Sequence, residues 1–206
     1  MDNSSAFAKH CRLEAERRGI RQAQQTIFMG DGGNWIEPLH QDQFFRCPRI
    51  IDYFHAVEHL HDVAKALYPH DEPRRQRLAE HLKTLLWTGR LDALVHRLNR
   101  LVRHAGTPQP GDADDQPRVV LTRNAAYFHR HRDHMRYPEY RAKGWPIATG
   151  VTESAVKLFN KRVKGTEQFW SEQGVEPILA LRALWLSQDQ RWNHYWLGPT
   201  ARARAA

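Results

Sequence analysis

The helical pattern between residues 55 and 134 constrains the fold more than any other feature of this sequence. Leucine and alanine recur at the three- and four-residue spacing of amphipathic helices over 55–68, 72–87 and 91–104, and a fourth helix is expected over 119–134. The second and third of these segments stop at Gly89 and Gly106. These roughly 80 residues contain no convincing strand, so we predict an all-α block. Leucine at helical spacing is typical of a core, and we assign it no chemistry.

Two apolar runs precede this block and are predicted to be strands. The first covers residues 25–30 and is followed by Asp31 among three glycines, while the second covers 49–54 and leads into a helix that opens at His55. Open α/β sheets hold their functional carboxylates at strand ends, which is how Asp31 is placed. The structural alternative is a simple turn in which Asp31 accepts a hydrogen bond from its own backbone.

A second acidic candidate follows the helical block. A helix is expected to start near Thr152, a good capping residue, with Glu153 in its first turn, and further helices are expected over 172–187 and 191–197. Carboxylates from separate elements can hold two divalent ions around a reacting phosphate, and magnesium prefers such oxygen ligands. The alternative for Glu153 is stabilisation of the helix dipole.

Two other patterns have a possible function. His55, Glu58 and His59 form an H-x-x-E-H sequence, which on a helix could chelate zinc as in a peptidase. A basic run between residues 157 and 164 places lysines on one helix face, which could lie along a DNA backbone or be an ordinary solvated surface. The residues of this predicted DNA-binding face are Lys157, Lys161, Arg162 and Lys164.

Composition favours a cytoplasmic protein with a polyanionic partner. The formal net charge is +8, and 26% of the 206 residues are charged. The two cysteines, Cys11 and Cys47, form no C-x-x-C pair and no disulfide framework, which fits a reducing compartment. The first residues contain no apolar leader, and no apolar run approaches the ~18 residues of a membrane span, so we expect neither a signal peptide nor a membrane partner.

Several blocks of the sequence together resemble a known family. In chain order they are GDGGNWI, IIDYFHAVEHL, GWPIATGVTESAVKLFNKRVKG, FWSEQGVEPILALRAL and RWNHYW. The chain is similar, from about Ala15 to Trp196, to the C-terminal part of bacterial insertion-sequence transposases of the ISKra family, which are related to the Mutator-like DDE group.

The resemblance implies an RNase H-like core, α/β but mostly helical, that is interrupted by an all-α insertion. It makes Asp31 and Glu153 catalytic metal ligands for Mg²⁺ or Mn²⁺, with Asp52 and His55 in supporting positions. The implied partner is double-stranded DNA at transposon ends, and the implied reaction is metal-dependent strand cleavage and strand transfer. The predicted organisation is a partial core over 1–56, the insertion over 57–135, C-terminal core helices over 136–198 and a disordered tail over 199–206.

The family's first catalytic aspartate has no matching position in this sequence. We therefore expect a truncated transposase that is inactive alone and pairs with a missing N-terminal half or with a second copy. One alternative is a non-catalytic, basic helical module that binds DNA or a partner. Another is the zinc peptidase based on residues 55–59.

Overall fold

The structure, a computed structural model, describes residues 4–164 and 169–197. It divides into two compact units, 1–149 and 150–206. The predicted helical block 57–135 lies within the first unit, and the predicted segment 136–198 contributes to both. The elements of the first unit are α1 (Ser4–Arg17), β1 (Phe28–Gly30), α2 (Ile36–Gln43), β2 (Arg49–Ile51), α3 (Tyr53–Leu67), α4 (Glu72–Trp87), α5 (Leu91–Ala105), α6 (Pro117–His131), η1 (Arg132–His134) and α7 (Tyr137–Ala142). Those of the second are α8 (Gly150–Val163), α9 (Glu172–Ser187) and α10 (Arg191–Leu197).

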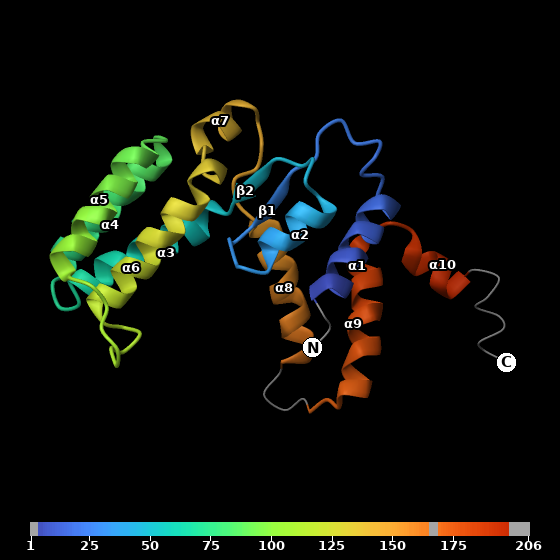
Figure 1. The fold of residues 1–206 in the computed structure, drawn as a ribbon. Coiled ribbons are helices and arrows are strands. Elements are labelled where there is room, and N and C mark those ends of the chain that lie inside the picture. Colours follow the sequence, from blue (N-terminus) through green and yellow to red (C-terminus); the bar gives the residue numbers. More distant parts are fainter. Residues whose placement is uncertain (1–3, 165–168, 198–206) are drawn as a thin grey trace. The chain divides into compact units, whose positions relative to one another are not determined.

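The described residues are therefore mostly helical, with two short strands that pair in parallel (Figure 1). Phe28 pairs with Arg49 and Gly30 with Ile51, and α2 forms the crossover between the strands. Parallel neighbours need such a crossover because both strands must run in the same direction. A small core between α1 and α2 contains Ala8, Leu39, Phe44 and Cys47.

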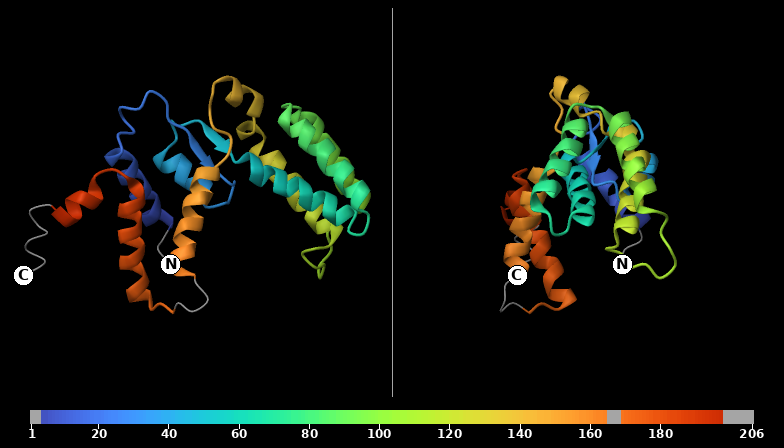
Figure 2. Two further views of the ribbon diagram at one scale, coloured as in Figure 1. Left: turned by 180° about the vertical axis from the view of Figure 1, so that it is seen from behind. Right: turned by 90° about the vertical axis from the view of Figure 1, so that its left-hand side faces the viewer.

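The four long helices α3–α6 pack into one group in which each helix contacts two others. Figure 2 shows this group from two further directions, with α3 beginning where β2 ends. The leucines that predicted the helices fill its core: Leu60, Leu82, Leu94, Leu98 and Leu121 are all fully buried. Each such side chain contributes on the order of 2 kcal/mol of hydrophobic free energy. The predicted all-α character of this region is confirmed.

Both predicted strands are shorter than expected: β1 begins at Phe28 and not at residue 25, and the second strand ends early. It ends at Ile51, and α3 begins at Tyr53, two residues before the predicted opening at His55. The reason is that Asp52 caps the helix, its side chain accepting a hydrogen bond from the His55 backbone N–H. An apolar Tyr-Phe pair continues the strand-like pattern of the sequence, but the cap directs both residues into the first helical turn.

The segment after α6 returns to the end of β2. The hydroxyl of Tyr137, on the unpredicted helix α7, donates to the Ile51 carbonyl at 3.1 Å, and the Tyr53 backbone N–H donates to the Ile147 carbonyl at 2.8 Å. Tyr137 is fully buried. The last residues of the first unit are thus held at the strand ends by backbone and side-chain hydrogen bonds.

The second unit contains α8 packed on α9, and α9 packed on α10. Its helix α8 begins at Gly150, so Thr152 lies inside the first turn and does not cap the helix as predicted. The rings of Trp185 and Trp192 meet edge to face at 5.1 Å between centroids. The predicted tail 199–206 lies outside the described residues. Across the described ranges, no helix combines the length and apolar character that a membrane crossing requires.

Candidate functional site

The carboxyl ends of β1 and β2 lie side by side, and an aspartate follows each strand at once. The Asp52 backbone N–H donates to the Gly30 carbonyl at 2.8 Å, which extends the parallel pairing by one residue. The predicted strand-end position of Asp31 is confirmed. Ligand sites of α/β proteins form at this edge of a parallel sheet, because the loops that leave it converge there.

Asp31 is exposed and shapes its own loop. One carboxylate oxygen, Oδ1, accepts a hydrogen bond from the Gly33 backbone N–H at 2.8 Å. This is the turn, stabilised by its own aspartate, that the sequence offered as the alternative to a catalytic Asp31. The Asp31 backbone carbonyl accepts the Tyr127 hydroxyl of α6 at 2.9 Å. The loop after β1 is therefore tied to a helix that lies 96 positions further along the chain.

Gly32 allows this loop to approach α6. Its φ is +87°, in the left-handed region that side chains rarely adopt. A Cβ atom here would lie 2.9 Å from Tyr127 Cε2 and 3.1 Å from His131 Nε2. Glycine is therefore favoured at position 32 for two reasons: the backbone has a positive φ, and there is no space for a Cβ atom.

Asp52 has a different environment, since it is fully buried. Its Oδ1 accepts the His55 backbone N–H at 3.0 Å, and its Oδ2 accepts both the backbone N–H and the hydroxyl of Thr149. Burial alone would raise the pKa of Asp52, but the hydrogen bonds from His55 and Thr149 outweigh it and lower the pKa below the ordinary value. This carboxylate joins β2, α3 and the segment that leads to α8.

His55 and His59 stand one turn apart on α3. The His55 Nδ1 lies 3.1 Å from the Glu58 carboxylate, and the His59 Nδ1 lies 2.6 Å from Asn124 Oδ1. The amide nitrogen of Asn124 donates to the Val120 carbonyl, so its oxygen must face His59. His59 Nδ1 therefore carries a hydrogen, and its Nε2 is the atom left for a ligand. The His59 ring also stacks on Tyr127 with 3.9 Å between centroids.

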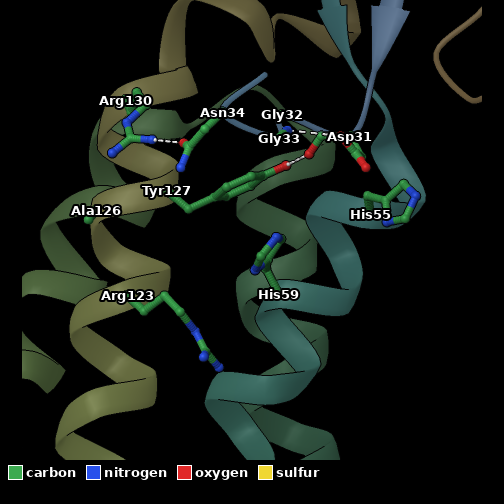
Figure 3. Close-up of a pocket in the computed structure, with 10 residues that line it drawn as sticks. All are labelled: Asp31, Gly32, Gly33, Asn34, His55, His59, Arg123, Ala126, Tyr127 and Arg130. Atoms are coloured by element: carbon green, nitrogen blue, oxygen red, sulfur yellow. Dashed lines mark hydrogen bonds between the residues drawn. The ribbon is translucent and has the colours of Figure 1, made fainter. Parts of the chain in front are cut away.

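A cavity of about 460 Å³ opens at this place, between the loop after β1 and helices α3 and α6. Figure 3 shows the two histidines on α3 across from Arg123 and Arg130 on α6, with the Asp31 loop above them. Arg130 donates to the Asn34 side-chain oxygen at 2.7 Å, which ties the arginine to the loop. The structure thus brings together Asp31, His55 and His59, which the sequence singled out separately.

The contribution of α6 to the cavity was not predicted from the sequence. Arg123, Tyr127 and Arg130 follow one another at spacings of four and three residues, so they share one helix face. The sequence shows this spacing, but it does not show which other helix the face lies against. Only the packing of α6 against α3 shows that these side chains and the two histidines line one cavity.

Buried polar groups lie beneath the loop after β1. Arg49, whose side chain is 1% exposed, forms an ion pair with Glu37, yet its Nη2 has no hydrogen-bond partner among the described residues. His131 is also buried, and neither ring nitrogen has such a partner in the described part of the chain. Burial, followed by the positive charges of Arg49 and Arg130, lowers the pKa of His131 from 6.5 to about 4.

The remaining predicted site residues lie in the second unit. Glu153 occupies the first turn of α8 and is exposed. Lys157, Lys161 and Lys164 are exposed as well, while the side chain of Arg162 lies outside what the structure describes. Within residues 4–164 and 169–197, no group of three or more His, Cys, Asp or Glu side chains is placed to hold a metal ion.

Comparison with known proteins gives no relative: no protein-family model, no curated protein and no solved structure matches this chain.

Proposed function

We propose that this chain is part of the catalytic domain of a DDE transposase of the ISKra type. The reaction would be divalent-metal-dependent cleavage of DNA strands at transposon ends, followed by their transfer to a target. In this proposal Asp31 and Glu153 bind Mg²⁺ or Mn²⁺ within an RNase H-like core, and α3–α6 are the all-α insertion. The pairing of Asp31 with Glu153 rests on the family resemblance, because the two residues belong to different units.

One observation carries the proposal, namely the position of Asp31 at the carboxyl edge of a parallel strand pair. The chain leaves this edge at Asp52, forms the helices α3–α7 and returns to the edge at Thr149, whose side chain donates a hydrogen bond to Asp52. Glu153 follows Thr149 by four positions in the sequence. A strand-end aspartate, an inserted helical block and a glutamate at the start of the next helix make up the order that the resemblance implies.

The first test reads the DNA upstream of the coding sequence. Translation of a few hundred nucleotides in three forward frames should give apolar strands, the first of them ending in an aspartate. That residue would supply the acidic position that has no match here. Upstream DNA without such a frame would remove catalysis from the proposal.

The second test measures the chemistry directly. The chain, co-expressed with the upstream segment, should cut DNA at the ends of its element when Mg²⁺ or Mn²⁺ is added, and the chain alone should not. Asp31→Asn and Glu153→Gln should each abolish cutting. The matched variants Asp115→Asn and Glu176→Gln, on exposed positions, should retain it. Cutting that survives Asp31→Asn would contradict the assigned role of this residue.

A second candidate function is non-catalytic binding of nucleic acid, and the surface of α5 favours it. Arg97, Arg100, Arg103 and His104 line one surface depression on this helix. Such a module should bind duplex DNA with an affinity that falls steeply with salt and is the same in Asp31→Asn. Binding that requires Asp31 or a divalent ion would argue for the transposase instead.

A further inference from the structure

The cavity between the loop after β1 and helices α3 and α6 presents more cationic than anionic groups. Arg123 and Arg130 line one side, and His55 and His59 line the other, whereas Asp31 is the one carboxylate among the lining residues. The Asp31 Oδ1 is already turned toward the Gly33 backbone N–H. A ligand in this space therefore meets a net positive charge, because two arginines face it and only one aspartate does among the lining residues.

The donors of the cavity are available to a ligand, and two of them, Arg130 and His59, are also held in place by neighbouring side chains. Arg123 forms no hydrogen bond or ion pair with any described residue, and Arg130 uses one guanidinium nitrogen on Asn34. Asn124 and the Tyr127 ring fix the His59 ring, which leaves its Nε2 for a ligand. Planar guanidinium groups suit the oxygens of a phosphate, and charge-assisted bonds of this kind are the strong ones.

The size of the cavity indicates more than a single ion. Its volume of about 460 Å³ falls within the ~300–1,000 Å³ typical of small-molecule sites. A lone phosphate would leave most of this space to water. A phosphate with its sugar would extend along the cavity between α3 and α6.

We propose that this cavity binds a phosphate group of a nucleotide chain through Arg123, Arg130 and His59. The residues belong to α3 and α6 of the helical block, and the resemblance assigns no role to any of the three. The inference does not depend on metal chemistry, Glu153 or an upstream segment. It extends the proposed function at the cavity that Asp31 lines, and binding measured in EDTA lets the two fail separately.

The test measures binding to the purified chain in EDTA at constant ionic strength. The probes are inorganic phosphate, the 5′-phosphorylated dinucleotide pdTdT and its uncharged methylphosphonate analogue without the 5′-phosphate. We expect pdTdT to bind more tightly than inorganic phosphate and the analogue to show no measurable binding. Arg123→Gln and Arg130→Gln should each weaken pdTdT binding by about tenfold, because each removes a charge-assisted contact.

The matched control is Arg77→Gln, which removes one exposed arginine from α4, outside the cavity lining. It should leave pdTdT binding unchanged. A loss in Arg77→Gln equal to that in Arg123→Gln would mean attraction to net charge and would overturn the proposal. Binding of inorganic phosphate alone, or no binding of either phosphate probe, would overturn it too.

An arginine variant could lose binding because it misfolds, so NMR of the unmodified chain gives a second test of the binding site. In the unmodified chain, pdTdT should shift the ring nitrogen signals of His59, and His59→Gln should remove the shifted signals while the circular dichroism of the helices is kept. A pdTdT complex without any change at His59 would contradict the proposed place of binding.

Discussion

The ends of the two strands carry the same residue in opposite environments. Asp31, after β1, is exposed and bonds its own loop, whereas Asp52, after β2, is fully buried and holds three donors from two other segments. A strand-end aspartate can therefore be available to a ligand or be part of the framework. The difference lies in what the following residues do: after β1 the chain forms a loop in which Gly32 packs against α6, and after β2 helix α3 starts immediately.

The largest effect is expected where the aspartate is part of the framework. Asp52→Ala should lower the free energy of unfolding of the first unit by about 4 kcal/mol, because it leaves the donors of His55 and Thr149 without an acceptor in a buried place. Urea titration followed by helical circular dichroism measures this value. Asp71→Ala is the matched control, since Asp71 also caps a helix but is not buried, and it should cost about 1 kcal/mol. Equal losses in the two variants would contradict the framework role.

The two strand ends should also respond to acid at different pH values. His131, which lies against Gly32, has a folded pKa of about 4 against 6.5 when unfolded, so the unfolded chain binds a proton first. The stability it contributes is present above pH 6.5 and is lost as the pH falls toward 4, by up to about 3 kcal/mol. The lowered pKa of Asp52 acts in the same direction, but only as the pH falls below the ordinary aspartate value of 3.8.

The pH dependence of urea unfolding in His131→Leu tests this difference. The slope between pH 6.5 and 4 should be reduced in the variant, whereas the loss below pH 3.8 should remain. His134, whose pKa is also lowered by burial, leaves a smaller slope of the same sign. An unchanged slope in His131→Leu would show that this ring is not responsible.

A smaller effect is expected for Gly32, the glycine that lets the first loop approach α6. Gly32→Ala should cost about 2 kcal/mol, through left-handed backbone strain together with the close approach to Tyr127. Gly111→Ala is a close control, because its φ is +89° and nothing lies within 4 Å of its added Cβ. It should cost about 1 kcal/mol, from strain alone. Thermal unfolding of both variants gives the two losses of stability, and their difference is the cost of the steric contact at Gly32. A larger loss for Gly111→Ala than for Gly32→Ala would contradict this steric cost.

The smallest effect is expected at Asp31 itself. Asp31→Asn keeps an oxygen that can accept the Gly33 N–H, and the position is exposed, so stability should change by less than about 0.5 kcal/mol. Amide hydrogen exchange in the first unit would check that the fold is intact. If this variant were as unstable as Asp52→Ala, any loss of DNA chemistry in it would have no bearing on a catalytic role.

The second unit shows where prediction from the pattern stops. The apolar periodicity of α9 predicted its helix over 172–187, and the structure has the same bounds. However, Leu78 and Leu82 of α4 are buried by neighbouring helices, whereas no described side chain of the second unit is buried. Periodicity reports how a helix divides its faces, but a second surface is needed to bury one of them.

The amino-acid sequence by itself determined the local structure: the helices of the block from their leucine spacing, the strand that ends before Asp31, and the helix start that bears Glu153. These follow from interactions between residues a few positions apart, which a linear pattern records. Only the tertiary structure decided that Asp52 is buried, that Tyr127 bonds the loop after β1, and that two arginines of α6 face two histidines of α3. Such contacts join residues up to 97 positions apart, and their geometry depends on packing that no spacing in the sequence encodes.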